Sequence, residues 1–412
     1  MELIKKRALQ IWLILMLPGF LWSGSEPSRR SGIYAFVADL YHGVRVIDVS
    51  DPMSPIEVAF YDTPGDARDL YISENYLYVA DGGTGLRIAD ISDPTNPHEV
   101  GYYDTPGYAY GIHVLENYAY VADMDSGIRI IDVSDPTNPT EIGYCDTDAC
   151  FNIHASGDYV YAGTTIPGFT IVDVSDPENP FKAGFYNAPL WVEDCPVSGR
   201  YAYVGLSGYK TVIREKTDIP NDNPPRDVFQ IVDISDPSSP FKVSAINSSV
   251  IPSWVFGVDV DDNYAYLAAY EAGLQIVDIS DPMNPSVVGY YDTSGNYNYG
   301  VYVMGSYAYI ADFGGYFRVI DISDPTAPFQ TGILGISDAY AVHVVDYESP
   351  EVTVISPNGG EIFDVGDTCD ITWLATDNVG VDSVSILYST DAGLSWDTIA
   401  TGEPNDSLYE WI

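Results

Sequence analysis

A short phrase, Asp-(Val/Ile)-Ser-Asp-Pro, occurs seven times in this chain and restricts its fold more than any other feature. Its second aspartate falls at Asp51, Asp93, Asp135, Asp176, Asp236, Asp281 and Asp324. The successive steps are 42, 42, 41, 60, 45 and 43 residues. A period in the low forties is typical of β-propeller blades and of helical HEAT-type repeats. The chain therefore repeats one structural unit seven times.

Each unit is predicted to form four β-strands. In residues 108–146 the runs YAYGIHV, YAYVAD, IRIIDV and TEIGYCD are separated by LEN, MDSG and SDPTNP. No run has the sustained 3.6-residue period of a helix. Several runs are apolar on both faces, as a sheet packed between two other sheets requires. Because four strands per repeat is the propeller count, the pattern predicts an all-β, seven-bladed propeller over residues 32–347.

The ends of the repeat array predict how the ring closes. The first unit begins with IYAFVAD, residues 33–39, which corresponds to the second strand of the other units. The missing first strand appears at the other end as AYAVHVV, residues 339–345. We therefore expect the last strand to pair with the first and to complete blade one.

Two phrases, LRIADISDP and LQIVDISDP, resemble the LVIVD-repeat family of exported bacterial and archaeal proteins. The resemblance extends over all seven units. It implies a propeller at the cell surface, and it implies no established reaction and no catalytic residue.

Residues 348–412 predict a second, immunoglobulin-like module. The segments VTVISPNGGEIFDVGDTCDITWLA and VDSVSILYSTDAGLSWDTIA contain alternating strands and Gly, Pro and Asp turns. The phrasing SPNGGE…ITW resembles sandwich domains appended to exported bacterial proteins. Only about five or six strands fit, where seven or more are usual, so we expect an incomplete sandwich. Its STDAGLSW segment, residues 389–396, matches the Asp-box pattern and is interpreted as a hairpin turn.

The N-terminus has the order of a secretory signal peptide, predicted over residues 1–25 with a linker at 26–31. Lys5, Lys6 and Arg7 precede the apolar run ALQIWLILMLPGFLW and then small residues. About 15 apolar residues are few for a membrane span, and no later stretch is a transmembrane candidate. We therefore expect a secreted or cell-surface protein.

The charge limits the partners. With 60 acidic and 17 basic residues the net charge is -43, which repels nucleic acid and anionic membranes. The remaining partners are an extracellular protein or a carbohydrate.

No Gly-x-Ser-x-Gly, phosphate-binding loop or His-Glu-x-x-His motif occurs, so no catalytic residue is assigned. A binding or adhesion module is the favoured function; a polysaccharide lyase or hydrolase using the same face stays open as the alternative.

Ligand-binding candidates gather on one face of the predicted ring. This variable face carries the loops between second and third strands and the loops that join blades, and binding residues prefer variable loops on a rigid scaffold. An insertion separates Val204 from Phe229 by 24 residues and is rich in bases. The predicted ligand-binding residues are Lys210, Arg214, Lys216, Arg226, Tyr108, Tyr110, Tyr297 and Tyr299.

Other repeated positions allow more than one interpretation. Asp39, Asp81, Asp123 and Asp312 end second strands and are either turn caps or ligands for Ca²⁺, the one cofactor considered. Arg45, Arg87, Arg129 and Arg318 share a third-strand column and are interpreted as structural. Three first-strand histidines, His113, His154 and His343, are expected to line a channel too wide for them to share one ion. A disulfide between Cys145 and Cys150 is a further candidate.

Overall fold

The computed structural model describes residues 32–208, 226–261, 263–293, 297–347, 351–356, 369–376, 383–388, 397–404 and 408–411. These residues form strands and turns and no helix. The repeats, residues 32–345, make one compact unit, and the strands from Asp346 onward belong to another. The predicted signal peptide, the Asp box and most of the long insertion lie outside the described residues.

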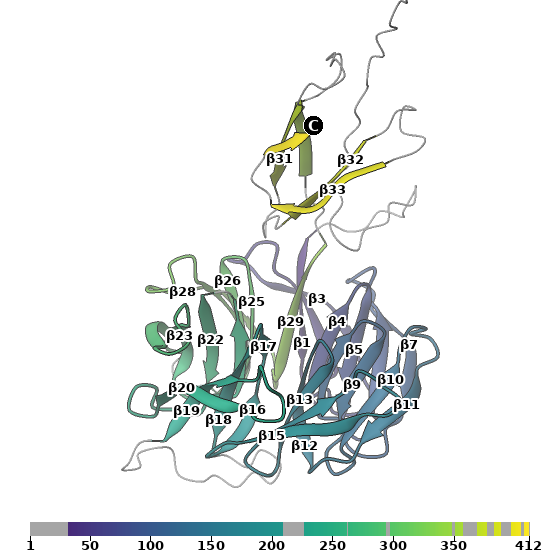
Figure 1. Ribbon diagram of the computed structural model, residues 1–412, viewed down its shortest axis with the longest axis vertical. Helices are drawn as coiled ribbons and strands as arrows, with labels where there is room; N and C mark the ends of the chain where they lie inside the picture. Colours follow the sequence, from purple (N-terminus) through teal and green to yellow (C-terminus); the bar gives the residue numbers. More distant parts are fainter. Residues whose placement is uncertain are drawn as a thin grey trace, which may run out of the picture. The chain divides into compact units, whose positions relative to one another are not determined.

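Together the seven repeats form a ring of seven antiparallel sheets, the blades of a propeller (Figure 1). Blades one to four, from inner to outer strand, are β29 (Ala341–Asp346), β1 (Ile33–Ala38), β2 (Val44–Asp48), β3 (Ile56–Tyr61); β4 (Asp69–Ser73), β5 (Tyr76–Ala80), β6 (Leu86–Asp90), β7 (His98–Tyr103); β8 (Gly111–Leu115), β9 (Tyr118–Ala122), β10 (Ile128–Asp132), β11 (Thr140–Cys145); and β12 (Cys150–Ser156), β13 (Tyr159–Thr164), β14 (Gly168–Asp173), β15 (Phe181–Asn187).

Blades five to seven continue the same order, except that the inner strand of blade five is broken in two. They are β16 (Trp191–Asp194) and β17 (Val197–Ser198), β18 (Tyr201–Ser207), β19 (Asp227–Asp233), β20 (Phe241–Asn247); β21 (Gly257–Val260), β22 (Tyr264–Ala269), β23 (Gly273–Asp278), β24 (Ser286–Tyr291); and β25 (Tyr297–Met304), β26 (Tyr307–Phe313), β27 (Tyr316–Asp321), β28 (Phe329–Gly335). The break follows from Pro196, which has no N–H to donate to a sheet.

The ring closes as predicted. Strand β29, from the end of the repeats, pairs with β1, from their beginning, and the two lie side by side in Figure 1. Tyr340 N donates to Ala38 O at 2.9 Å just ahead of the paired strands. Blade one is thus built from both ends of the propeller, and β1 is not left as an unpaired edge of its sheet.

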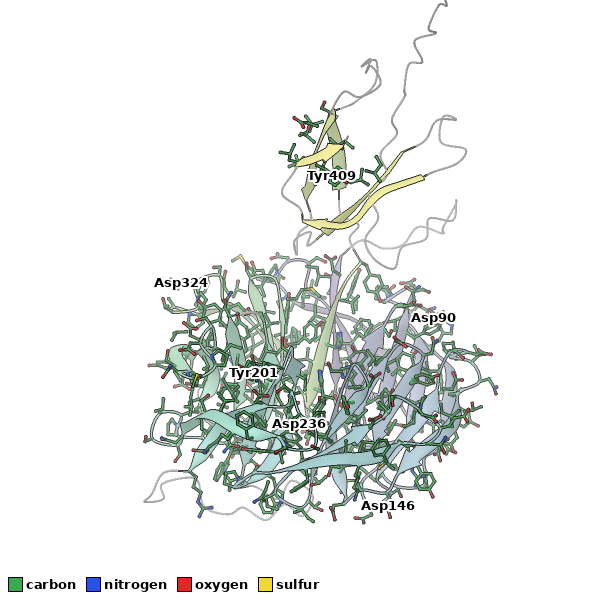
Figure 2. All side chains as sticks on the ribbon, in the orientation of Figure 1. Asp90, Asp146, Tyr201, Asp236, Asp324 and Tyr409 are labelled. Carbon is green, nitrogen blue, oxygen red and sulfur yellow. The ribbon has the colours of Figure 1, made fainter. Side chains whose placement is uncertain are left out.

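The repeated phrase forms the turn between the third and fourth strands. In blade two, Ser92 N donates to Asp90 Oδ1 at 2.8 Å and Thr95 N donates to Asp93 Oδ1 at 3.0 Å. The same two bonds recur around the ring, for example at Ser134 and Thr137. The aspartate side chains accept hydrogen bonds from backbone N–H groups that the turn would otherwise leave unsatisfied, as expected of Asx-type turns. Acidic side chains such as Asp90 and Asp324 lie at the periphery of the ring (Figure 2).

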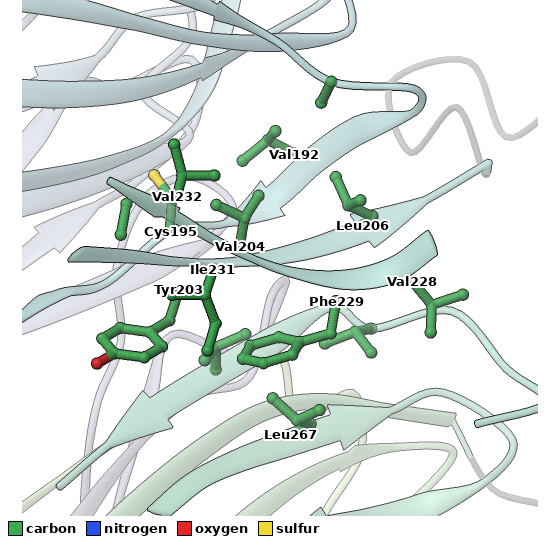
Figure 3. Packing of buried hydrophobic residues seen from close by; sticks show 14 of the residues in the cluster. Val192, Cys195, Tyr203, Val204, Leu206, Val228, Phe229, Ile231, Val232 and Leu267 are labelled. Carbon is green, nitrogen blue, oxygen red and sulfur yellow. The ribbon is translucent and has the colours of Figure 1, made fainter. Parts of the chain in front are cut away.

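The apolar core lies between blades. Val204 and Phe229 of blade five pack in one cluster with Leu267 of blade six (Figure 3). Blade one packs against blade seven in the same way, through Ile47 and Phe317. Burial on both sides of every sheet explains why the strands are apolar on both faces.

The unit beyond the propeller contains two small sheets. Strands β30 (Glu351–Ser356), β31 (Cys369–Thr376) and β34 (Leu408–Trp411) form one sheet, and β32 (Ser383–Tyr388) and β33 (Asp397–Pro404) form the other. Trp373 and Ile386, one from each sheet, are fully buried.

The candidate disulfide is not formed. Cys145 and Cys150 are buried free thiols. Cys150 Sγ instead donates to Gly127 O at 3.2 Å, and burial raises the pKa of this thiol to about 12. Both sulfur atoms serve as small apolar groups in the interface between blades three and four.

Candidate functional site

A pocket of about 210 Å³ lies where the inner strands of all seven blades begin. Each of these strands follows a loop that joins two blades, so the pocket opens on the variable face. We call it the mouth pocket, since it stands at one end of the channel that the inner strands surround.

Seven residues, one from each blade, form the outer layer of this pocket. We call them the mouth ring: Arg68, Tyr110, Phe151, Glu193, Phe256, Tyr299 and Tyr340. Each occupies the same place in its repeat. Five are aromatic, one is basic and one is acidic, so the ring offers mainly flat apolar surface with one charge of each sign.

Irregular strand pairing explains how mouth-ring side chains reach the pocket. The registers of β12, β16 and β25 shift at Phe151, Glu193 and Tyr299, respectively. A β-bulge of this kind adds a residue that is not paired and re-aims its side chain. Strict alternation would point Glu193 and Asp194 to opposite faces, yet both line the pocket.

The aromatic members of the ring contact one another. Tyr299 stacks on Tyr340 with centroids 5.0 Å apart and meets Phe256 at 4.6 Å. Tyr110 contacts Tyr340 edge to face at 6.3 Å, and their hydroxyl oxygens lie 3.0 Å apart. Tyr110 also meets Phe151 at 6.4 Å. The five rings therefore form one continuous aromatic arc, with geometries that aromatic pairs prefer.

Arg68 lies against the tyrosines of this arc. Its guanidinium carbon is 5.0 Å from the ring centroid of Tyr110 and 5.7 Å from that of Tyr340. Its Nη2 lies 3.4 Å from Asp66 Oδ2. Burial acts to lower the pKa of Arg68, but the surrounding tyrosines act to raise it, and the net pKa lies above its ordinary value. The side chain therefore stays a cation.

Below the ring, two carboxylates join neighbouring inner strands. Asp69 Oδ2 accepts from Ile112 N at 2.9 Å, and Asp194 Oδ2 accepts from Val258 N at 2.9 Å. Burial raises the pKa of Asp69 to about 6 and that of Asp194 to about 7, against the opposing effect of these backbone donors. Glycines and an alanine hold the equivalent places in four other blades, which leaves room for the pocket.

Deeper in the channel, aromatic side chains pack closely. His113 lies between Tyr71 and His154, with ring centroids 4.4 Å from each, and Tyr302 stacks on His343 at 4.5 Å. The expectation that a wide channel separates the histidines is wrong for His113 and His154, because these side chains fill the channel. Burial lowers the pKa of His154 and of His343 to about 4, so both are neutral at pH 7.

Comparison with known families assigns the repeats. The LVIVD repeat matches residues 30–63, 64–105, 106–147, 149–188, 227–247, 255–293 and 295–334. The chain belongs to the LVIVD-repeat family. Residues 350–411 match a bacterial Ig domain. No match to this LVIVD protein is found among curated proteins.

Solved structures similar to the LVIVD protein include several propellers. A hypothetical selenium-binding protein from Sulfolobus tokodaii is 11% identical, with a TM-score of 0.58 over 78% of this chain and 94% of the other. A functionally unknown protein from Desulfotomaculum acetoxidans is 12% identical, with a TM-score of 0.58 over 76% and 99%. The WD40 propeller domain of Doa1 is 11% identical, with a TM-score of 0.52 over 88% and 95%. At these identities the likeness concerns the fold alone.

The LVIVD propeller brings two of the four predicted tyrosines, Tyr110 and Tyr299, into the mouth pocket. Tyr108 lies beside it, where its hydroxyl bonds Asp66 Oδ2 at 2.5 Å. Tyr297 does not line the pocket and instead stacks on Tyr270 at 4.3 Å. Of the predicted bases, Lys210, Arg214 and Lys216 lie outside the described residues. Arg226 is exposed, and its backbone N donates to Ser248 Oγ at 3.2 Å.

The four calcium candidates occupy four separate blades of the LVIVD ring, and each is fully buried. Each lies near the arginine of its own blade, at distances from 2.8 Å for Arg318–Asp312 to 3.9 Å for Arg87–Asp81. Asp123 also accepts from Thr105 Oγ1 at 2.6 Å. Within the described ranges no group of three His, Cys, Asp or Glu side chains is placed to hold a metal. Calcium binding stays a prediction, and each carboxylate already has a structural role.

Five members of the mouth ring were not among the residues predicted from the sequence: Arg68, Phe151, Glu193, Phe256 and Tyr340. A signal was present, because every member stands three residues before the first-strand column that contains the histidines. Residue type does not mark this column, because it differs between blades, and the bulges break the alternation by which inward positions are identified.

Proposed function

We propose that this LVIVD protein is an exported or cell-surface binding module that holds a protein or carbohydrate ligand at the mouth pocket. The mouth ring carries this proposal: seven blades each contribute one side chain, and five of the seven are aromatic. Aromatic side chains in a concave site give large contact area at low entropic cost, for sugar rings and for protein side chains alike.

A surface location is supported by two observations. LVIVD repeats and a bacterial Ig domain occur together in one chain. Residues 1–25 have the composition of a signal peptide. Among the described residues, no helix has the length and apolarity needed to cross a bilayer. The net charge of -43 favours neutral or basic partners over nucleic acid.

Arrayed glycans and arrayed peptides, probed with the purified protein, test the proposal. Tyr299→Ala should weaken binding of any ligand found by about tenfold or more, as expected for a central aromatic contact. Tyr290→Ala is the matched control, since Tyr290 lies on the outer strand β24 and is 66% exposed. Undiminished binding by a folded Tyr299→Ala protein would place the ligand elsewhere.

A hydrolase or lyase on the same face is the second candidate, because Asp69 and Asp194 both line the pocket with raised pKa values. Such carboxyls are suited to acid–base catalysis near neutral pH. Their oxygens, however, already accept backbone N–H bonds, which favours binding over catalysis. Release of shortened sugars from any bound glycan, lost in Asp194→Asn, would support the enzyme instead.

A further inference from the structure

The mouth pocket combines negative charge with aromatic walls. Three acidic side chains, Asp69, Glu193 and Asp194, line it, against one base, Arg68. That base already has Asp66 beside it, at 3.4 Å. The carboxylates therefore outweigh the local positive charge, and the low dielectric of the enclosed site strengthens their effect.

Apart from Arg68 Nε, which has no hydrogen-bond partner among the described residues, the carboxyl groups and the Tyr110 and Tyr340 hydroxyl groups of the pocket already make hydrogen bonds within the protein. Both oxygens of Asp69 accept backbone N–H groups, from Leu70 and Ile112, at 2.9 Å each. Asp194 accepts from Cys195 N, Val258 N and Asn152 Nδ2, also at 2.9 Å each. The hydroxyl groups of Tyr110 and Tyr340 bond each other. The site thus supplies negative potential and ring surface, but little capacity for new hydrogen bonds.

This combination selects among ligand groups. A neutral sugar presents many hydroxyls, and each would lose its water on entry without gaining a full replacement. An anion would meet Glu193 and the partly ionised carboxyl groups of Asp69 and Asp194. A quaternary ammonium group carries a positive charge on an apolar surface and donates no hydrogen bond. Aromatic cages are a recurring way to bind such groups.

The protein itself shows that this aromatic arc holds a cation. Arg68 lies 5.0 and 5.7 Å from the ring centroids of two tyrosines of the arc, Tyr110 and Tyr340, and 5.6 Å from that of the neighbouring Tyr108. Glu193 and Phe256 belong to blades five and six, away from Arg68 in blade two, and they line the remaining part of the pocket together with Phe151 and Tyr299.

From these contacts we infer that the mouth pocket binds a quaternary ammonium group, seated against Phe256 and Tyr299 with Glu193 as its nearby counter-charge. This inference rests on the proposed function, because it names the chemical group that the binding module recognises. It extends that function from a class of partner to a specific group that the partner carries.

Calorimetric titration of the full chain with three small probes tests the inference. The probes are choline, its neutral isostere 3,3-dimethylbutan-1-ol, and methyl glucoside. Choline should bind at least about tenfold more tightly than the isostere, since the two share a shape and differ in charge. Equal affinity for the two, tighter binding of methyl glucoside, or no choline binding would each overturn the inference.

Two substitutions separate charge from fold. Glu193→Gln should weaken choline binding by about tenfold and leave binding of the isostere unchanged. Asp62→Asn is the control, because Asp62 is exposed on the same face and does not line the pocket. Thermal unfolding of each variant establishes that it is folded. If the two substitutions weaken choline binding equally, choline is attracted by the overall negative charge of this face and not by Glu193, which would contradict the assigned site.

The inference and the proposed function can fail separately. An arrayed ligand whose binding is lost in Tyr299→Ala but does not compete with choline would overturn only the inference. Choline binding that depends on Glu193, with no arrayed protein or carbohydrate bound at the mouth, would overturn the choice of partner and keep the quaternary ammonium site.

Discussion

Gly143 of β11 lies directly against the carbonyl group of Pro177 in the next blade: a Cβ at Gly143 would stand 2.1 Å from Pro177 O. The same approach recurs between other neighbouring blades, with corresponding distances of 1.9 to 2.2 Å, at Gly101–Pro136, Gly184–Pro237, Gly289–Pro325 and Gly332–Pro52. Between blades five and six a serine replaces the glycine, and Ser244 Oγ donates to Pro282 O at 2.6 Å. The repeated phrase therefore joins blades as well as forming turns.

Replacing Gly143 by valine should destabilise the propeller by about 2 kcal/mol or more, because a side chain there must push two blades apart. Urea unfolding measures the change. Gly83→Ala is the control, since its Cβ would meet only Tyr108, at 3.9 Å. Similar unfolding midpoints for the two variants would show that the close approach does not matter for stability.

Because β29 closes the ring, the stability of the propeller should depend sharply on whether the chain includes this last strand. A chain ending at residue 335 lacks β29 and should expose the edge of β1, with aggregation or loss of cooperative unfolding. A chain ending at residue 347 keeps β29 and should unfold cooperatively. If both truncated chains unfold at the same temperature, pairing of β29 with β1 does not stabilise the ring.

Channel histidines predict a pH-dependent stability difference. The folded-state pKa of His154 is about 4, below its ordinary value of 6.5, so the unfolded chain takes up a proton first as pH falls. His154 therefore costs stability between pH 6.5 and pH 4, by at most about 3 kcal/mol. As the pH falls from 6.5 to 4, the free energy of unfolding of His154→Gln should therefore rise relative to that of the parent.

The raised pKa values of Asp69, Asp194 and Asp259 act in the opposite direction, because they favour folding as pH falls through 7 to 4. The readout is therefore the difference between His154→Gln and the parent, measured by urea unfolding at several pH values. His98→Gln, on the exposed strand β7, is the control. A difference that does not change with pH would mean that His154 can be protonated in the folded channel.

Shortening the long insertion of blade five should reduce ligand binding and leave the propeller folded. Replacing residues 209–225 by the short turn GGTG keeps β18 and β19, which pair with each other up to Gly205 and Phe229. The unfolding temperature should stay within a few degrees of the parent, while binding of any ligand found on the arrays falls. Retention of full affinity would remove Lys210, Arg214 and Lys216 from the candidate site.

The fold could be predicted from the sequence because local and repeated signals agree. The period of the phrase, the strands that are apolar on both faces and the one-strand offset between residues 33–39 and 339–345 all indicate one closed ring. Turn aspartates such as Asp93 act through bonds to residues two positions away, so their role can be read from neighbouring sequence.

The site depended on tertiary structure. Tyr110 and Tyr340 are 230 positions apart in the chain, yet their hydroxyl groups bond each other. Their meeting follows from ring closure, which brings blade one beside blades two and seven. The bulge at Glu193 turns an outward position toward the pocket, and no local residue pattern marks that change. Repetition along the chain thus determined the blades, whereas convergence of seven dissimilar residues on one axis arose only when the ring closed.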